Sequence, residues 1–331
     1  MTKICTFITR GKKIESLHHA KCLVVGNNKE ILLSTKNDND IIFPRSAIKL
    51  FQAIPFVASG AASIYNLNSK QIALSCSSHS AEPAHVNQLS KWLKKLKLKK
   101  YSLQCGIHNP LNFNSSNILL LSGNKPNQLH NNCSGKHLAM ISGSLANKYE
   151  IKNYLEFHHP YQQIIRKTLE QFTESKIIKK NYGIDGCSAP QYAFKINNLS
   201  TALLNLIKSY DKQFIYNQEI STLLNSILKN PFMIAGKNRF DTDLIKISDS
   251  KIFCKGGAEG VFLFAHLRKK IVGVIKISDG NERAIPSIVC LLLEKLKITS
   301  PSENLQLENW KNIKIRNHAK NITGEIYSII K

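Results

Sequence analysis

With 331 residues, 43% of them hydrophobic, the chain can form one large domain or two ordinary ones with a real core, so we expect a folded protein and not a disordered one. No run of about 18 apolar residues occurs, and the N-terminal sequence lacks the apolar core of a secretion signal. We therefore expect a cytoplasmic protein without a membrane span. The formal net charge of +24 would ordinarily indicate a nucleic-acid partner, but the lysines are spread over every region, so we expect a solvated lysine surface and no nucleic acid.

The eight cysteines are scattered along the chain instead of framing a small domain. This distribution is typical of a reducing compartment, where thiols persist and disulfides are rare. We expect free thiols.

Taken in chain order, the pattern of apolar residues predicts strands at both ends and helices between them. Short β-branched runs predict strands at 4–9, 20–25 and 30–34. After Pro44 the period changes, and a helix is expected from near Arg45 to Gly60. Further helices are expected at 69–75, 84–97, 135–147, 160–174 and 219–229. The C-terminal region is expected to contain strands at 251–255, 260–268 and 271–277, a helix at 282–297 and a final strand at 321–330.

This order predicts an α/β fold with one antiparallel sheet built from both termini and an inserted helical lobe. The sheet lobe is expected to contain about 1–44 and 231–331, and the helical lobe about 45–230. Together they form a single domain over 1–331.

A first candidate site is the pair Ser46 and Lys49, which three-residue spacing brings to one face of the expected helix. A neutral lysine could serve as base for the serine, and the free N–H groups at the helix start would favour a developing oxyanion. The same spacing recurs elsewhere in this lysine-rich chain, so an ordinary surface pair is the alternative.

Two further segments offer partners for that pair. Lys255 ends an expected strand and opens onto Gly256 and Gly257, where the missing side chains would let a substrate lie close to the backbone. Ser78, in a run of small hydroxyl residues, could present a second hydroxyl. The alternatives are an ordinary turn at Lys255 and a polar loop capping the helix that starts near Pro83.

A metal site is suggested by two separated thiols. Cys133 and Lys136 lie three apart where a loop meets a helix, and Cys187 follows Asp185. Two thiolates could hold Zn²⁺ with nitrogen or oxygen ligands, for which His130 and His137 are the routine candidates. Two unligated buried thiols are the alternative.

Arg239 follows Gly236 in a loop that also contains Asp241. A guanidinium there could hold a substrate carboxylate by two parallel hydrogen bonds, with a surface ion pair as the alternative.

Six motifs in register together resemble the asparaginase II family, the rhizobial-type L-asparaginases. They are Pro44 to Lys49, Cys76 to Ser80, His130 to His137, Asp185 to Pro190, Ala235 to Thr242, and Lys255 to Val261. The resemblance runs from about residue 5 to the C-terminus. It implies a fold like the serine β-lactamases and penicillin-binding proteins, and hydrolysis of L-asparagine to L-aspartate and ammonia.

The resemblance also implies roles for individual residues. Ser46 would pair with Lys49, and Ser78 with Lys255, as the catalytic groups. The implied ligands of a zinc ion beside the pocket are Cys133, Lys136 and Cys187, the lysine being kept neutral by the metal. The candidate substrate-binding residues are Arg45, His79, Asp185 and Arg239.

Three functions compete. The first is an L-asparaginase in which Ser46 attacks the side-chain amide and forms an acyl-enzyme. The second is a β-lactamase-like or peptidase-like serine acyl-enzyme acting on another amide. The third is a basic nucleic-acid-binding protein, for which no reader motif is present. The expected partner is the small molecule L-asparagine, and a homodimer is one assembly that the sequence allows.

Overall fold

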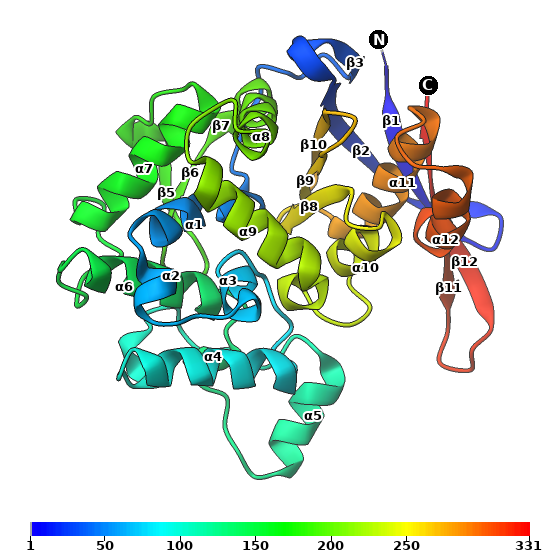
Figure 1. Ribbon diagram of the computed structural model, residues 1–331. Coiled ribbons are helices and arrows are strands. Elements are labelled where there is room, and N and C mark those ends of the chain that lie inside the picture. Colours follow the sequence, from blue (N-terminus) through cyan, green and yellow to red (C-terminus); the bar gives the residue numbers. More distant parts are fainter. Residues whose placement is uncertain (1) are drawn as a thin grey trace. The chain divides into compact units, whose positions relative to one another are not determined.

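The computed structural model describes residues 2–331 (Figure 1). The chain divides into two compact units. The sheet unit contains the residues up to Ala47, residues 194–207 and residues 243–331; the helical unit contains residues 48–193 and 208–242. Residues 194–207 lie within the span expected for the helical lobe and belong to the sheet unit.

The sheet unit is built on an antiparallel sheet of eight strands. Seven of them follow the order β11 (Ile313–Arg316), β12 (Ile322–Ile330), β1 (Ile4–Arg10), β2 (Lys13–Val25), β10 (Ile271–Ile277), β9 (Val261–His266), β8 (Ile252–Gly257). The eighth, β3 (Ile31–Ser34), pairs with β2. The first and last strands of the chain are neighbours, with Ile4 opposite Ile330. This confirms the prediction of one antiparallel sheet built from both termini.

The strands β8, β9 and β10 form the most deeply buried part of the sheet. Every residue of β9 is buried, which suits the continuous apolar run of its sequence because both faces of such a strand are covered. The two strands expected at 260–268 and 271–277 form a hairpin, with His266 opposite Ile271 across the turn that contains Lys269 and Lys270.

Helices and a small second strand pair complete the sheet unit. The helix α11 (Ile285–Lys295) packs on β12 and β1, and α12 (Pro301–Lys311) packs on α11. The strand pair joins β4 (Ile41–Ile42) to β7 (Phe194–Lys195), which leads directly into α8 (Ile196–Tyr210). α10 (Phe240–Ile247) precedes β8. α8, α10 and α12 were not among the predicted helices.

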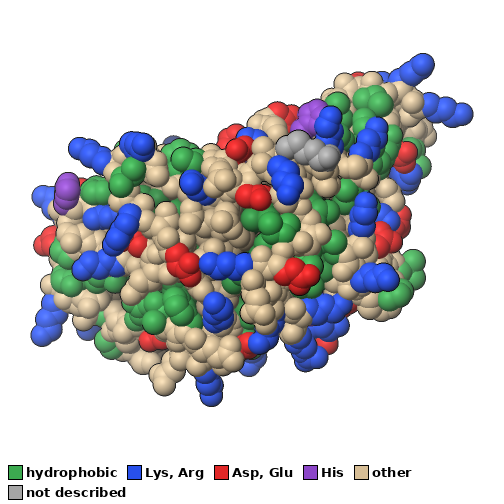
Figure 2. Space-filling view, turned by 90° about the horizontal axis from the view of Figure 1, so that it is seen from above, with side chains coloured by type: hydrophobic (Ala, Val, Ile, Leu, Met, Phe, Trp, Pro, Cys, Tyr) green, Lys and Arg blue, Asp and Glu red, His purple; other side chains and the backbone are tan. Residues whose placement is uncertain are grey.

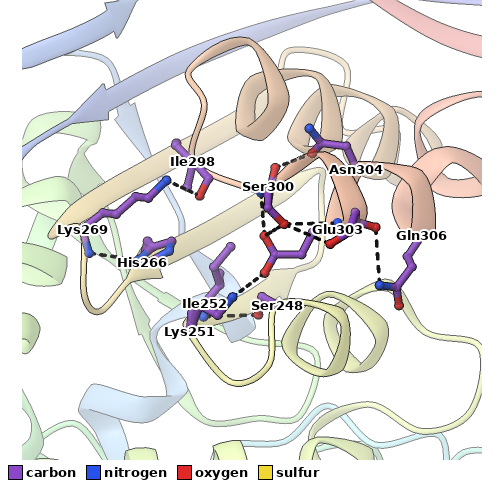
Figure 3. Close-up of polar contacts among 12 residues, drawn as sticks. Ser248, Lys251, Ile252, His266, Lys269, Ile298, Ser300, Glu303, Asn304 and Gln306 are labelled. Atoms are coloured by element: carbon purple, nitrogen blue, oxygen red, sulfur yellow. Dashed lines mark hydrogen bonds and ion pairs between the residues drawn. The ribbon is translucent and has the colours of Figure 1, made fainter.

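A polar network ties the start of α12 to the edge of the sheet (Figure 3). Ser300 caps the helix and exchanges hydrogen bonds with Glu303, whose other carboxylate oxygen accepts a hydrogen bond from Lys251 Nζ at 2.8 Å. Lys269 Nζ donates to the carbonyl of Ile298 just before this helix, at 2.9 Å. These contacts fix the α11 to α12 connection to residues that flank β8 and β9.

The helical unit surrounds one buried helix, α1 (Lys49–Ala58), which packs on α6, α7 and α9. Its side chains Leu50, Phe51, Ile54 and Phe56 are fully buried. The other helices are α2 (Ala61–Ile64), α3 (Ser69–Leu74), α4 (Pro83–Lys95), α5 (Phe113–Leu121), α6 (Ser134–Ala146), α7 (Pro160–Thr173) and α9 (Asn217–Lys229). A short hairpin joins β5 (Tyr182–Ile184) to β6 (Pro190–Tyr192).

The helix expected to start near Arg45 begins differently. Arg45 has a φ of 52°, a left-handed conformation that an α-helix does not accommodate. The chain therefore makes a 3-10 turn over Arg45–Ile48 (η2), and α1 starts at Lys49. Ser46 lies in the turn before the helix, not inside it.

In Figure 2, Lys and Arg side chains are spread over the visible face among Asp and Glu and do not gather in one patch. No helix within residues 2–331 combines the length and the apolar character needed to cross a bilayer.

Candidate active site

Lys49, the first residue of α1, is completely buried in the helical unit. Its Nζ donates hydrogen bonds to the Ser77 carbonyl at 2.5 Å, to Ser78 Oγ at 3.0 Å and to Cys133 Sγ at 3.2 Å. Three acceptors therefore surround this nitrogen. Burial of an unpaired amine would be costly, and these contacts both compensate that cost and fix the position of Nζ.

The segment that carries Ser78 is held by its own backbone and by the end of α3. The Leu74 carbonyl accepts hydrogen bonds from both Ser77 N and Ser77 Oγ, at 3.1 and 2.8 Å. Ser78 N donates to the Ile234 carbonyl at 2.8 Å. The hydroxyl of Ser78 thus meets Lys49 on a rigid turn.

Gly135, in the first turn of α6, allows a close approach to this turn. A Cβ at this position would lie 2.0 Å from the Leu74 oxygen. Only glycine permits the helix to pass so near the carbonyl that holds Ser77. The motif around Cys133 therefore packs directly on the motif around Ser78.

His79 is buried and links the two motifs. The Ala81 N–H donates to His79 Nδ1 at 3.1 Å, so this nitrogen must accept and the proton of the neutral ring is on Nε2. Nε2 can then donate to Ser134 Oγ at 2.9 Å. Burial, followed by the nearby charges of His85 and Lys49, holds the pKa of His79 well below its usual value. With both ring nitrogens engaged inside the protein, His79 connects the Ser78 turn to the start of α6.

The candidate metal ligands converge within the same unit. Cys133 is the N-cap of α6, Lys136 lies in its first turn, and Cys187 follows Asp185 in the turn between β5 and β6. Lys136 Nζ lies 3.0 Å from Cys187 Sγ and 3.9 Å from Asp185 Oδ2. All four residues meet in the interior, with the side chains of Lys136 and Asp185 only 3% and 6% exposed.

The two thiols differ in protonation. A hydrogen bond from Cys133, together with the charge of Lys136, outweighs burial and lowers the pKa of Cys187 to about 5. The same hydrogen bond and burial raise the pKa of Cys133 to about 12. Burial alone would lower the pKa of Lys136, but the two sulfurs and Asp185 raise it. At neutral pH the cluster thus contains a thiol, a thiolate and an ammonium group.

The donor set suits a zinc ion. Two sulfurs and an amine nitrogen are ligands that zinc accepts, and binding would displace protons from Cys133 and Lys136. Within residues 2–331, no three His, Cys, Asp or Glu side chains come together in a metal-binding group. A zinc site with three protein ligands at this cluster would have to include Lys136. His137 Nδ1 is engaged by the Tyr154 hydroxyl at 2.6 Å, whereas its buried Nε2 has no hydrogen-bond partner within residues 2–331.

The sheet unit brings together a second set of candidates. Lys255, in β8, is buried and its Nζ donates to the Gly256 carbonyl at 2.7 Å. A Cβ on Gly257 would lie 2.4 Å from the Pro44 oxygen and 3.3 Å from Ser46 N. The glycine end of β8 therefore packs against the backbone of the turn that carries Ser46, as the missing side chains allow.

Arg45 and Arg239 are partly exposed and lie in different units. Arg45 is in the turn beside Ser46. The loop before Arg239 packs within the helical unit, where Lys237 N donates to Glu82 Oε1 at 2.8 Å. Gly236 in this loop has a φ of 117°, and a Cβ there would lie 2.1 Å from Ser80 Oγ.

The contact between Lys49 and Cys133 was not predicted. The resemblance placed the zinc ligands beside the pocket and paired Lys49 with Ser46. In the structure the Lys49 amine contacts both Ser78 and Cys133. The two residues are 84 positions apart, and no local pattern signals their contact.

A buried lysine that contacts both a serine hydroxyl and a cysteine sulfur is a group suited to proton transfer. The L-asparaginase II family model matches residues 7–328, and the chain belongs to this family. It is an enzyme of the L-asparaginase class.

Comparison with solved structures found a provisionally assigned β-lactamase from Bacteroides dorei, 11% identical, covering 78% of this chain and 84% of that one with a TM-score of 0.39. It also found a β-lactamase from Mycobacterium bovis, 10% identical, covering 84% of this chain and 94% of that one with a TM-score of 0.41. No curated protein sequence matches the chain.

Proposed function

We propose that the chain hydrolyses L-asparagine to L-aspartate and ammonia through a serine acyl-enzyme. The observation that carries this proposal is the buried amine of Lys49, hydrogen-bonded to Ser78 Oγ at 3.0 Å in a chain of the L-asparaginase II family. A lysine excluded from water and fixed beside a hydroxyl can exchange protons with it once the amine is neutral.

In the proposed reaction Ser46 Oγ attacks the side-chain amide carbon and a neutral Lys49 accepts its proton. N–H groups at the start of the helical segment stabilise the oxyanion. The carbon–nitrogen bond then breaks, the proton returns to the leaving nitrogen, and ammonia departs. Water attacks the resulting ester, its proton passes to the lysine, and aspartate leaves as Ser46 is regenerated.

Ser78 and Lys255 complete the proposed proton path. Ser78 Oγ accepts a hydrogen bond from Lys49, so it can pass a proton between that amine and the substrate. Lys255 is buried at the glycine end of β8, which packs on the Ser46 turn. Lys255 is proposed as the second catalytic amine.

Substrate binding is proposed for Arg45, His79, Asp185 and Arg239. Each guanidinium group by itself suits the α-carboxylate of asparagine, because a planar fork can hold a carboxylate by two hydrogen bonds. Asp185 offers a carboxylate for the α-ammonium group. His79 acts through the Ser78 turn, since both of its ring nitrogens have partners within the protein.

Cys133, Lys136 and Cys187 are proposed to hold a zinc ion. Bound there, zinc would supply a Lewis acid that polarises and orients a substrate group. The chain's own contribution is to hold the three donors within the interior, with Lys49 in contact with the Cys133 sulfur. Ligand geometry thereby becomes coupled to the position of the catalytic amine.

The activity test is ammonia release from asparagine and from glutamine by purified protein, with and without added zinc. Wild type should favour asparagine. Ser46→Ala should lose at least about a thousandfold in kcat, as expected for loss of a nucleophile. Full ammonia release by Ser46→Ala would refute the role of Ser46, and a matching total loss in Ser78→Ala alone would assign the nucleophile to Ser78.

The metal test measures zinc by elemental mass spectrometry. Wild type should carry one zinc per chain, and Cys187→Ser or Lys136→Met should lose it. Cys290→Ala serves as matched control because this buried thiol lies in α11 of the sheet unit. Zinc retained by both ligand variants would contradict the assignment.

A further inference from the structure

Asn131, two residues before Cys133, is buried and held by hydrogen bonds on every side. Only 4% of its surface is exposed. Its Oδ1 accepts a hydrogen bond from Cys133 N at 2.9 Å, and its Nδ2 donates to the Cys105 carbonyl at 2.7 Å. Its backbone carbonyl accepts from Ser134 N at 3.0 Å, and its N–H donates to the Gln128 carbonyl at 3.2 Å. The turn before α6 is therefore fixed both by the side chain and by the backbone of one residue.

Helix capping accounts for only part of these contacts. The first N–H groups of a helix lack partners within it, and an asparagine oxygen placed just before the helix commonly accepts from them. The Oδ1 atom of Asn131 fills that role for Cys133, the N-cap of α6. An aspartate would accept equally well and would suit the positive end of the helix dipole better. Capping does not require a donor, so the contact made by the amide nitrogen needs another explanation.

The amide nitrogen of Asn131 ties this turn to the segment 105–108. At the other end of the segment, His108 Nε2 accepts from Asn132 N at 2.9 Å, and His108 Nδ1 contacts the Asn109 carbonyl at 2.6 Å. Because Nε2 accepts, the proton of the neutral ring is on Nδ1 and faces that carbonyl. The tie from Asn131 is buried, whereas the tie from His108 is partly open to solvent. Water competes less for the buried hydrogen bond, so that bond restrains the turn more strongly.

The position of Cys133 matters to the site in two ways. Its Sγ accepts a hydrogen bond from Lys49 Nζ at 3.2 Å, and it is one of the proposed zinc ligands. The backbone N–H that Asn131 holds belongs to the same residue as this sulfur, so a shift of the turn moves the sulfur relative to the amine. A misplacement of about 1 Å in a catalytic constellation costs roughly a hundredfold in rate. Loss of an outer partner of a metal ligand costs about ten- to a hundredfold in metal affinity or activity.

We propose that Asn131 is a positioning residue of the active site, whose amide nitrogen holds the Cys105 carbonyl and thereby fixes the Cys133 sulfur against Lys49. Asn131 acts through Cys133 and is assigned no contact of its own with substrate or metal. The inference rests on the function proposed above. It extends that function to a residue outside the Ser-Lys pairs and the zinc ligands.

The test compares Asn131→Asp with wild type. Aspartate keeps the acceptor for Cys133 N and removes the donor for the Cys105 carbonyl, so the cap is preserved and the tie is cut. The kcat for asparagine should fall by about ten- to a hundredfold, with KM changed by less than about threefold. The zinc dissociation constant, measured by competition with a chelator, should rise by about ten- to a hundredfold. A residue that only caps α6 would leave all three values unchanged.

A second variant and a matched control accompany this substitution. His108→Ala loosens the same turn from a half-buried position and should lower kcat by a smaller factor. The control is Asn281→Asp in the sheet unit, where Asn281 Oδ1 accepts from Arg283 N at 3.1 Å at the start of η7 (Glu282–Ala284). It makes the same substitution in the same kind of turn, and it should keep the wild-type kcat and zinc affinity. Circular dichroism checks that each variant is folded.

The two measurements separate this inference from the proposed function. Wild-type kcat and zinc affinity in folded Asn131→Asp, or an equal loss in Asn281→Asp, overturns the positioning role. If Asn131→Asp does not fold, an unchanged kcat in His108→Ala overturns it instead. A wild type that releases no ammonia refutes the proposed function, and weaker zinc binding by Asn131→Asp would then still support the positioning of Cys133. A wild type that neither releases ammonia nor binds zinc refutes both.

Discussion

Replacing Gly135 by alanine should damage the active site more than it damages the fold. The new Cβ would meet the Leu74 oxygen at 2.0 Å, where ordinary contact begins near 3.4 Å, so α6 and the end of α3 must separate by about 1.4 Å. That oxygen accepts both hydrogen bonds from Ser77, whose own carbonyl accepts from Lys49. The displacement is thereby transmitted to Ser78 and to the catalytic amine.

The expected loss of stability in Gly135→Ala is small, and the expected loss of catalytic rate is large. Overpacking costs about 1 to 3 kcal/mol, and the better helix propensity of alanine returns about 1 kcal/mol. The free energy of unfolding should therefore fall by about 2 kcal/mol or less. A misplacement of about 1 Å in a catalytic constellation costs roughly a hundredfold in rate, so kcat for asparagine should fall by about that factor.

The assay compares kcat per folded molecule with urea unfolding of the same preparation. Gly143→Ala is the matched control, since its Cβ would meet the Tyr161 ring at 2.2 to 2.5 Å, two turns further along α6. This control should lose comparable stability and keep its kcat. A Gly135→Ala enzyme with wild-type kcat, or an equal loss of kcat in both variants, would refute the proposed transmission through Leu74.

Three other changes test the description of the fold. Burial alone would raise the pKa of Glu303, but hydrogen bonds from Lys251 and Ser300 hold this pKa below its usual value. These contacts therefore stabilise the folded protein above about pH 4.3, and their contribution is lost as the pH falls through the pKa of the folded state. Glu303→Gln should cost about 1 kcal/mol in urea unfolding at pH 7, and the gap to wild type should close in acid; a gap that persists at pH 3 would contradict this. Burial lowers the pKa of His79, so the unfolded chain takes up a proton at a higher pH than the folded chain, and the free energy of unfolding should fall below about pH 6.5. The variant His79→Gln should show a shallower slope of unfolding free energy against pH. An unchanged slope would argue against a buried neutral ring. Gly236→Ala would place a Cβ 2.1 Å from Ser80 Oγ at a residue with a φ of 117°, so the free energy of unfolding, measured by thermal denaturation, should fall by about 2 kcal/mol or more. Gly106→Ala, also at positive φ but with open space around it, should lower the free energy of unfolding by less.

Local patterns predicted most of the elements. The β-branched runs of β8 to β10 and the apolar period of α4, α6 and α7 specify these elements without help from distant residues. α5 was missed because its apolar residues do not face a core, so its pattern differs from that of an ordinary surface helix. In α8, the buried residues Leu199, Leu203 and Leu206 follow a helical spacing. This helix was not predicted because its first turn is rich in asparagine, which favours loops.

The candidate site was predicted by residue type but not by contact. Motif positions named Lys49, Ser78, Cys133, Lys136 and Cys187, and all five lie buried in the helical unit. The contacts that join them depend on how separate helices pack. His79 meets Ser134, 55 positions away, and Gly135 beside Ser134 lets α6 approach the end of α3 closely. Contacts between residues so far apart in the sequence leave no local pattern from which they could be predicted.

The pairing of β1 with β12 has a consequence for biosynthesis. As the chain leaves the ribosome, β1 and β2 emerge first. The second pairing partner of β2, strand β10, and that of β1, strand β12, are synthesised much later. Until residues 322–330 have been made, the nascent protein exposes an apolar strand edge that other chains could join. Contacts between such distant segments also slow folding, because closing a long loop must precede the gain from pairing. The early strands of this enzyme therefore depend on its last ones, and their protection by chaperones should matter most during synthesis.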